Sequence, residues 1–351
     1  MIKGVLERYK EYLPLTEDTP KFTLGEGDTP LVHSRSIGNM VGCDRLFFKL
    51  EGCNPTGSFK DRGMVVAVAK AMEAGSTGIA CASTGNTSAS AAAYGAYAGL
   101  TTTIFVPKDA VARGKLNQAI AFGARIMLID GNFDQALGIV RSVTENSNMV
   151  LVNSINPDRI QGQKTAAFEI VQDLGAAPDY LFIPVGNAGN ISAYWLGFTE
   201  AYGFGWAATR PRMMGFQAAG AAPIVTDAPV AKPETMASAI RVGNPAGWHS
   251  ALRARDESGG SIDSVSDQEI LTAYKMMAQQ EGIFCEPASA ASVAGLIKLA
   301  ERKLHLKGKC VVCVITGTGL KDPDLASTLD PASMEEYPAD LKVVERALAQ
   351  A

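Results

Sequence analysis

The sequence predicts an α/β protein made of two αβα domains with mostly parallel twisted sheets. Three observations lead to this prediction. Short apolar runs alternate with helix-like runs along most of the chain, which is typical of parallel strands joined by crossover helices. Roughly ten strand-like runs are present, more than a small open sheet usually holds. A chain of 351 residues, 47% of them hydrophobic, is long and apolar enough for two cores.

The alternation can be followed from one end of the chain to the other. The segments with helical spacing are 1–13, 58–74, 87–98, 114–122, 133–145, 162–174, 267–280 and 288–303. The segments expected as strands are 44–51, 78–83, 101–107, 124–130, 149–154, 180–185, 212–218 and 310–316. The region 220–265 is rich in Ala, Gly, Pro and Ser, so we expect it to loop over the surface.

Composition and charge argue against nucleic-acid and membrane partners. The net charge of −4 provides no bulk attraction to a phosphate backbone, so no nucleic-acid partner is expected. No apolar stretch approaches the ~20 residues of a membrane span, so no membrane association is expected either. Glu7 and Glu11 interrupt the segment where a signal peptide would carry its apolar block. The sequence therefore predicts a soluble, cytoplasmic protein.

The cysteines and histidines argue against a metal site. His33, His249 and His305 are scattered, and none has a companion at metal-ligand spacing. Cys310 and Cys313 form a CxxC motif, but the surrounding KCVVCVI is typical of a buried strand, which places the two side chains on opposite faces. A redox or zinc-binding pair is the less favoured alternative.

Three loops stand where ligands bind in doubly wound sheets, between a strand end and a helix. The first is PVGNAGNIS (184–192). Its backbone N–H groups are expected to cradle a phosphate at a helix amino terminus, and the residues concerned are Gly186, Asn187, Ala188, Gly189 and Asn190. The alternative is a tight turn without a ligand. The loop is not GxGxxG and no acid follows the next strand, so a small phosphorylated cofactor fits better than a dinucleotide.

The second loop, NPTGSFKDRG (54–63), places Lys60 near the first turn of a helix. The helix dipole disfavours a cation there and lowers the lysine pKa, and a neutral amine is what covalent carbonyl chemistry needs. An equally weighted alternative makes Lys60 a solvated surface lysine and Asp61 the helix cap.

The third loop, ASTGNTSAS (82–90), gathers hydroxyl and amide side chains around Gly85 at another helix start. Such a loop suits a carboxylate, although an elaborate helix cap explains it equally well. Together, an activated lysine, a carboxylate loop and a phosphate cradle describe a site for pyridoxal phosphate holding an amino acid.

Five motifs of the sequence resemble those of a known family. The motifs NPTGSFKDRG, ASTGNTSAS, PVGNAGNIS, CEPASAAS (285–292) and ITGTGLKDP (315–323) occur in the order found in the threonine synthases, which are fold-type II pyridoxal-phosphate enzymes with the tryptophan-synthase β-like fold. The resemblance extends from about Gly25 to Pro323. It implies pyridoxal 5′-phosphate as cofactor in a cleft between the domains. The implied reaction converts O-phospho-L-homoserine and water to L-threonine and phosphate, by γ-elimination and β-addition.

The resemblance also implies roles for individual residues. Lys60 matches the lysine that binds the cofactor covalently and moves protons in catalysis, and Asn86 matches the amide bonded to the cofactor's phenolic oxygen. Thr316 matches the hydroxyl beside the pyridine nitrogen. A hydroxyl partner is expected to leave that nitrogen unprotonated, which makes the ring a weaker electron sink and favours side-chain elimination and replacement.

The remaining implied roles concern the cofactor phosphate and the substrate. Residues 186–190 match the cofactor-phosphate loop. The substrate carboxylate is expected at Ser83, Thr84 and Thr87, and the substrate phosphate at Lys115, Asn153, Ser154 and Arg159. For Lys115 the alternative is a solvated helix start, and for Arg159 an inter-domain salt bridge.

The resemblance implies a domain organisation and leaves a competing function. Residues 1–52 and 155–351 are expected to form a large cofactor-phosphate domain, and 53–154 a small mobile domain with Lys60 and the carboxylate loop. Family members are commonly homodimers, so a homodimer is expected. The alternative function is a threonine or serine dehydratase of the same fold, whose substrates carry no phosphate and would leave the 153–159 segment without a purpose.

Overall fold

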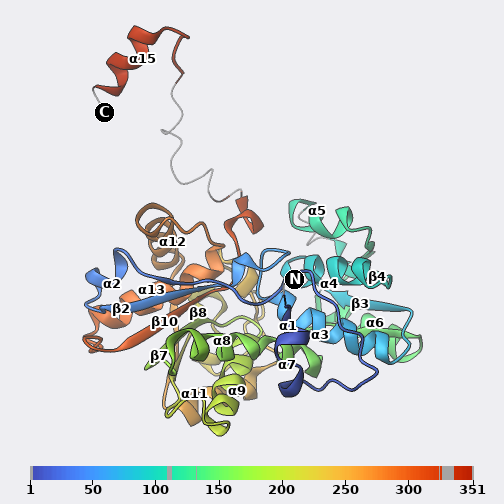
Figure 1. The fold of residues 1–351 in the computed structure, drawn as a ribbon. Coiled ribbons are helices and arrows are strands. Elements are labelled where there is room, and N and C mark those ends of the chain that lie inside the picture. The colour runs from blue at the N-terminus through green and yellow to red at the C-terminus, as the bar shows by residue number, and fades with distance from the viewer. Residues whose placement is uncertain (1–2, 109–112, 132, 324, 326–335, 350–351) are drawn as a thin grey trace. The chain divides into compact units, whose positions relative to one another are not determined.

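The structure is a computed structural model that describes residues 3–108, 113–131, 133–323, 325 and 336–349 (Figure 1). The chain divides into two compact units, Met1–Lys321 and Asp322–Ala351. The second unit contains helix α15 (Leu341–Leu348), in which no residue is buried. All of the sequence-predicted site residues belong to the first unit.

Two sheets form the first unit. The larger has the strand order β1-β2-β10-β7-β8-β9, and only β1 pairs antiparallel to its neighbour. Its strands are β1 (Leu31–His33), β2 (Arg45–Leu50), β7 (Tyr180–Pro184), β8 (Arg212–Ala218), β9 (Ser261–Val265) and β10 (Cys310–Ile315). Every residue of β7 and β10 is buried, as expected for central parallel strands that are covered on both faces.

The smaller sheet is wholly parallel, in the order β5-β4-β3-β6. Its strands are β3 (Gly78–Ala82), β4 (Thr101–Pro107), β5 (Arg125–Ile129) and β6 (Met149–Leu151). The central strand β3 is buried throughout, whereas the edge strand β5 has two exposed residues. The predicted α/β class with mostly parallel sheets is therefore confirmed.

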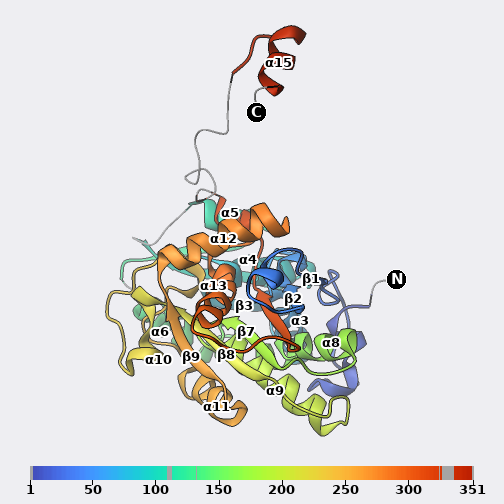
Figure 2. The same cartoon turned by 90° about the vertical axis from the view of Figure 1, so that its left-hand side faces the viewer.

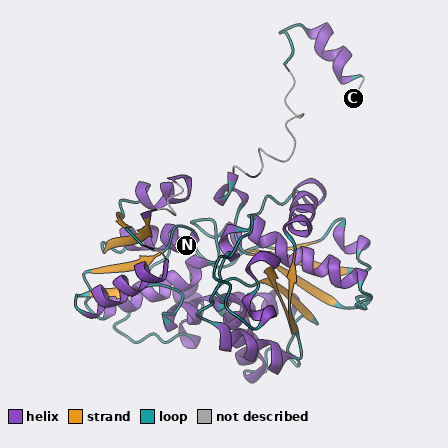
Figure 3. Cartoon of the chain, turned by 180° about the vertical axis from the view of Figure 1, so that it is seen from behind, coloured by secondary structure: helices purple, strands orange, loops and turns teal. Residues whose placement is uncertain are grey.

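Helices surround both sheets, as Figures 1 and 3 show. Their bounds are α1 (Val5–Arg8), α2 (Ile37–Met40), α3 (Lys60–Glu73), α4 (Asn86–Tyr97), α5 (Arg113–Ala121), α6 (Phe133–Glu145), α7 (Pro157–Gln163), α8 (Thr165–Leu174), α9 (Gly189–Gly203), α10 (Pro223–Thr226), α11 (Trp248–Ser258), α12 (Asp267–Glu281) and α13 (Pro287–Glu301). Helix α13 packs on β7, β8, β9 and β10 (Figure 2). No helix of the described ranges is long and apolar enough to cross a membrane.

Several sequence expectations are corrected. The region 220–265 is not only a surface loop, because α11 and the edge strand β9 lie in it. Helix α11 reads WHSALRARDES and strand β9 reads SIDSV, so neither element shows a clear hydrophobic period. The single helix expected at 162–174 is two helices, α7 and α8. The amino-terminal helix ends at Arg8 and is followed by a short 3-10 turn, whereas the sequence predicted it to reach residue 13.

A buried ionic network ties the start of α3 to the larger sheet. Arg62 donates to both oxygens of Glu51 and both oxygens of Glu169, at 2.6–2.8 Å. Lys49 on β2 also pairs with Glu169, at 2.9 Å. Burial opposes ionisation of Glu169, but Arg62 and Lys49 outweigh it and lower its pKa to about 2. Because Arg62 lies two residues after Lys60 in α3, the network holds the start of this helix in place.

Candidate active site

Lys60 is the first residue of α3, and the loop before it lies against the segment that follows β10. Phe59 N–H donates to the Thr316 carbonyl at 3.0 Å, and Thr318 N–H donates to the Gly57 carbonyl at 3.0 Å. A Cβ on Gly52 would lie 2.7 Å from the backbone nitrogen of Thr318, so only glycine permits this approach. The two motifs that contain Lys60 and Thr316 are therefore neighbours.

The amine of Lys60 is partly desolvated, unlike that of a surface lysine. Burial lowers its pKa to about 7, the charge of Arg159 acts in the same direction, and the charge of Glu286 opposes both. The sequence attributed the low pKa to the helix dipole, whereas burial is the largest cause in the structure. A large fraction of such an amine is neutral at pH 7 and can act as a nucleophile or a base.

Asp61 does not cap α3, as the alternative interpretation of this loop supposed. The helix cap is Phe59, and the carboxylate of Asp61 accepts from Thr56 N–H at 2.7 Å and from the hydroxyls of Thr56 and Ser90 at 2.6 Å each. Burial raises the pKa of Asp61 to about 6 against these hydrogen bonds. Asp61 thus joins the lysine loop to α4.

Arg159 reaches the site because α3 and α7 cross at glycines. A Cβ on Gly162 would lie 2.0 Å from the carbonyl oxygen of Arg62, and one on Gly63 would lie 2.6 Å from that of Arg159. Arg159 is fully buried and donates to the Val152 carbonyl at 3.2 Å. Its Nε and Nη2 have no partner among the described residues, and burial lowers its pKa to about 10. Two groups of a buried guanidinium are thus free to bind an anion.

Glu286, to which the sequence analysis assigned no role, joins two of the predicted residues. Its carboxylate accepts from Asn86 Nδ2 at 2.9 Å and from Thr316 Oγ1 at 2.7 Å. The three side chains come from the start of α4, the end of β10 and the residue before α13, and all are buried. The signal was present in CEPASAAS, where a lone acid precedes a helix-starting proline among small residues.

The loop 186–190 has the backbone of an anion cradle. Ala188 caps α9 with a left-handed φ of 65°, and Gly186 has no room for a side chain, since a Cβ would lie 2.9 Å from Ile240 Cα. Both amide atoms of Asn190 are buried without a partner in the described part of the chain. Asn187 bonds to the Ser154 hydroxyl and accepts from Ala246 N–H at 2.7 Å. An orphaned amide at a helix amino terminus fits a phosphate group.

The predicted substrate residues are placed differently from one another. Ser83, Thr84 and Thr87 are half-buried beside the start of α4. Asn153 is bonded through both amide atoms to the backbone of Ala82, at 2.9 Å each, at the end of β3. Lys115 lies in α5, but its side chain is outside the described residues.

These groups fit pyridoxal phosphate on their own chemistry. A buried lysine of low pKa can bind an aldehyde, and the 186–190 loop can hold a phosphate. Asn86 and Thr316 supply polar groups for the rest of the cofactor.

Cys310 and Cys313 are buried, unpaired residues of β10. In the ranges that the structure describes, no cluster of three or more His, Cys, Asp or Glu side chains is placed to hold a metal.

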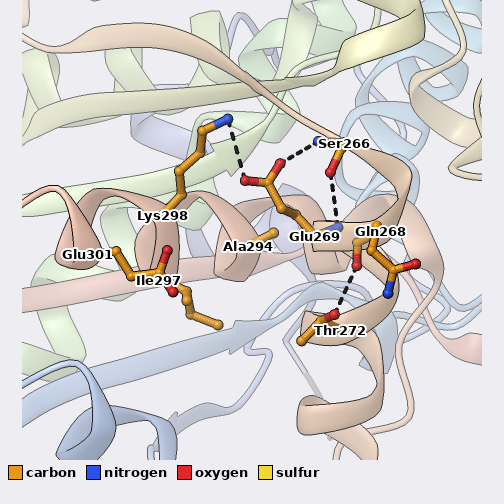
Figure 4. A pocket seen from close by; sticks show the side chains of 8 residues that line it. All are labelled: Ser266, Gln268, Glu269, Thr272, Ala294, Ile297, Lys298 and Glu301. Atoms are coloured by element: carbon orange, nitrogen blue, oxygen red, sulfur yellow. Dashed lines mark hydrogen bonds and ion pairs between the residues drawn. The ribbon is translucent and has the colours of Figure 1, made fainter.

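A separate cavity of about 250 Å³ lies between α12 and α13 (Figure 4). Two of its three charged residues, Glu269 and Lys298, form an ion pair with each other. Glu269 pairs with Lys298 at 3.5 Å and accepts from Ser266 N–H at 2.6 Å. None of the sequence-predicted site residues lines this cavity, so it is not the candidate active site.

Comparison with known proteins shows the family of the chain. The family model described as "Pyridoxal-phosphate dependent enzyme" matches residues 22–317. The chain belongs to this family of pyridoxal-phosphate dependent enzymes, and it depends on pyridoxal phosphate. The structure resembles maize serine racemase, with a TM-score of 0.73 and 22% identity over 99% of this chain and 95% of that one. It also resembles a tomato threonine deaminase, with a TM-score of 0.73 and 20% identity over 85% of this chain and 81% of that one. At such identities the likeness concerns the fold alone.

The sequence relatives are more specific. The chain is 57% identical to a threonine synthase of Halalkalibacterium halodurans, over 93% of this chain and 92% of the relative. It is 56% identical to a threonine synthase of Synechocystis, over 92% and 85%, and 52% identical to one of Mycobacterium tuberculosis, over 98% and 95%. Within the pyridoxal-phosphate enzymes, the chain is grouped with the threonine synthases, which confirms the resemblance found in the sequence.

Proposed function

We propose that this protein makes L-threonine and phosphate from O-phospho-L-homoserine and water. The observation that carries the proposal is the buried Arg159 guanidinium, which has two unpartnered donor groups and lies close enough to lower the pKa of Lys60. A dianionic phosphate is the kind of ligand that best compensates such a buried positive charge. An unphosphorylated amino acid would leave this charge buried and uncompensated.

Each residue group has a role in the proposed reaction. Bound pyridoxal phosphate supplies an electron sink for the substrate's α carbon. We assign its phosphate to residues 186–190, its phenolic oxygen to Asn86 and its ring nitrogen to Thr316. The neutral Lys60 Nζ removes the α proton and then a β proton, and it returns a proton later in the cycle. Arg159, with Ser154, holds the substrate phosphate while it leaves from the γ carbon.

The substrate carboxylate is assigned to the loop of Ser83, Thr84 and Thr87, at the amino terminus of α4, where helix N–H groups and hydroxyls favour an anion. Lys115 and Asn153 complete the proposed substrate-phosphate pocket. Because Asn153 already bonds to Ala82 through both amide atoms, its contribution is to fix the segment that carries Ser154 and Arg159.

We further propose a cytoplasmic homodimer in which residues 53–154 move as a small domain against residues 1–52 and 155–351. The strands β3–β6, all within 78–151, form a sheet of their own, which supports this division. Light scattering coupled to gel filtration tests the dimer. Hydrogen exchange with and without a substrate analogue tests whether the small domain becomes protected as one unit.

The experiment that tests the proposed reaction compares substrates. Purified enzyme with pyridoxal phosphate is expected to release inorganic phosphate and threonine from O-phospho-L-homoserine in equal amounts. Efficient deamination of threonine or serine, without phosphate release from O-phospho-L-homoserine, would instead support the dehydratase.

A further inference from the structure

The side chain of Lys321 lies against the loop 54–59, which precedes Lys60. Lys321 ends the short 3-10 turn that follows β10. Gly57 has a left-handed φ of 87°, and a Cβ on it would lie 3.2 Å from Lys321 Cε. The lack of a side chain on Gly57 therefore leaves room for the aliphatic part of Lys321. Thr318 N–H donates to the Gly57 carbonyl at 3.0 Å and holds the two segments together.

The ammonium of Lys321 reaches from this segment to helix α5. Lys321 Nζ donates to Gln118 Oε1, and Gln118 Nε2 donates to the Thr56 carbonyl at 3.3 Å. A primary amide carries an acceptor oxygen and a donor nitrogen, so one glutamine side chain can hold both bonds. Helix α5 is thereby tied to the two segments that carry Lys60 and Thr316.

The bond to Gln118 involves a partly desolvated charge. Lys321 is half-buried, and burial lowers its pKa, whereas the charges of Asp61 and Glu286 act in the opposite direction. An ammonium that loses water on folding needs protein acceptors, and the amide oxygen of Gln118 is one. Hydrogen bonds from charged donors are stronger than neutral ones. The bond from Lys321 is therefore well suited to hold α5 in place.

Helix α5 also carries a residue that the proposed function assigns to the substrate phosphate. Lys115 stands three positions before Gln118, which is less than one helical turn and ~4.5 Å along the axis. Leu116 and Ala119 are buried, and α5 packs on α4. Since a helix of nine residues moves as a unit, a bond at Gln118 also fixes the backbone at Lys115.

We propose that Lys321 is a positioning residue that holds α5 through Gln118 and thereby completes the substrate-phosphate pocket. This rests on the proposed function, which places Lys115 in that pocket. Lys321 then increases the affinity for a phosphorylated substrate without touching the phosphate. An amino acid without a phosphate gains nothing from the bond, so the pair of Lys321 and Gln118 contributes to substrate specificity.

The test measures phosphate binding separately from turnover. Inorganic phosphate is titrated into the pyridoxal-phosphate holoenzyme by calorimetry, and KM and kcat are measured for O-phospho-L-homoserine. Lys321→Met keeps an aliphatic side chain over Gly57 but removes the donor. It is expected to raise the Kd for phosphate and the KM by about tenfold, with a smaller change in kcat. The Kd for L-threonine, measured from the cofactor absorbance, is expected to stay at the wild-type value.

Three further variants test the route through α5. Gln118→Met breaks the same bond from the other side, so it is expected to raise the Kd for phosphate as Lys321→Met does. The double variant is expected to bind phosphate no more weakly than either single one, because one bond is lost in all three. Lys309→Met is the matched control. Lys309 lies at the other end of β10 and its Nζ donates to Asp179 at 3.0 Å, so its loss is expected to leave phosphate binding unchanged.

The outcomes separate the possible errors. A wild-type Kd for phosphate in Lys321→Met overturns the proposal. So does a raised Kd in Lys321→Met beside a wild-type Kd in Gln118→Met, which would mean that Lys321 acts on the phosphate directly. Equal losses of affinity for phosphate and L-threonine would overturn it as well, since they would indicate general damage to the site.

Two controls keep the result interpretable. Should Lys321→Met fail to fold, Gln118→Met, which alters an exposed side chain, decides the question against Lys309→Met. If the wild-type holoenzyme neither binds phosphate nor reacts with O-phospho-L-homoserine, the proposed function itself is wrong, and the role of Lys321 falls with it. Wild-type turnover with unchanged phosphate binding in both variants refutes the role of Lys321 alone.

Discussion

Replacing Arg159 with methionine is expected to make the protein more stable and less active at the same time. Among the described residues, no carboxylate forms an ion pair with the buried Arg159 guanidinium, and burial lowers its pKa from 12.5 to about 10. At about 1.4 kcal/mol for each pKa unit, the charge costs the folded state about 3 kcal/mol. Loss of the hydrogen bond to Val152 returns about 1 kcal/mol of that gain. Methionine has a similar length, so we expect a net gain of about 2 kcal/mol in the free energy of unfolding.

The same substitution removes the proposed phosphate ligand. Losing one hydrogen bond to a charged group costs ~1.5–3 kcal/mol, which lowers kcat/KM for O-phospho-L-homoserine by roughly ten- to a hundredfold. The assays are urea unfolding of the cofactor-free protein and phosphate release by the holoenzyme. Arg159→Lys is the matched control, since it keeps a buried cation and is expected to gain no stability. A methionine variant that is less stable than wild type would refute the reasoning that the charge is held at a cost.

The remaining predictions concern other parts of the site and its support. Lys60→Ala should abolish covalent capture of the cofactor, so borohydride reduction and peptide mapping should find no labelled lysine. In wild type, the rate of covalent capture should rise with pH around 7 rather than around 10, as the lowered pKa of Lys60 requires. Because the pKa of Glu169 is lowered to about 2, its ion pairs with Arg62 and Lys49 contribute stability above pH ~4.5 that is lost as pH falls toward 2. In Glu169→Gln, the free energy of unfolding should therefore depend less on pH in that window. An unchanged dependence on pH would contradict the assignment. Gly162→Ala should destabilise the protein by at least ~1–3 kcal/mol, because its Cβ would meet the Arg62 carbonyl at 2.0 Å. In the same thermal melts Gly138→Ala, in the exposed interior of α6 with open space around its Cβ, should stabilise by ~0.5–1 kcal/mol.

The parts of the fold that were predictable are those in which local pattern and burial agree. Strands such as β7 and β10 are continuous apolar runs bounded by turns, so their position follows from the sequence. The edge strand β9 reads SIDSV and is only half-buried, which leaves no clear alternation. Helix α7 was missed although Asn156 caps it and Pro157 begins it. That NPD signal was interpreted only as part of a substrate loop.

The candidate site also contains features that the local sequence pattern predicts and features that it does not. Lys60 and the loop 186–190 were predictable as candidates because each stands in a motif at the start of a helix. The cause of the low pKa of Lys60 was not, since it comes from packing and from Arg159, which the sequence places 99 positions away. Glu286 was missed for the same reason. Its meaning depends on Asn86, which is 200 residues distant, and no local pattern records that contact.

The most direct test of the central claim is the product ratio with O-phospho-L-homoserine as the only substrate. Inorganic phosphate and L-threonine are measured together after reaction with the pyridoxal-phosphate holoenzyme, with Lys60→Ala as the blank. The proposed function predicts one phosphate for each threonine in wild type and neither product in the variant. Phosphate release without threonine, or no reaction with this substrate alongside rapid formation of ammonia from threonine or serine, would contradict it.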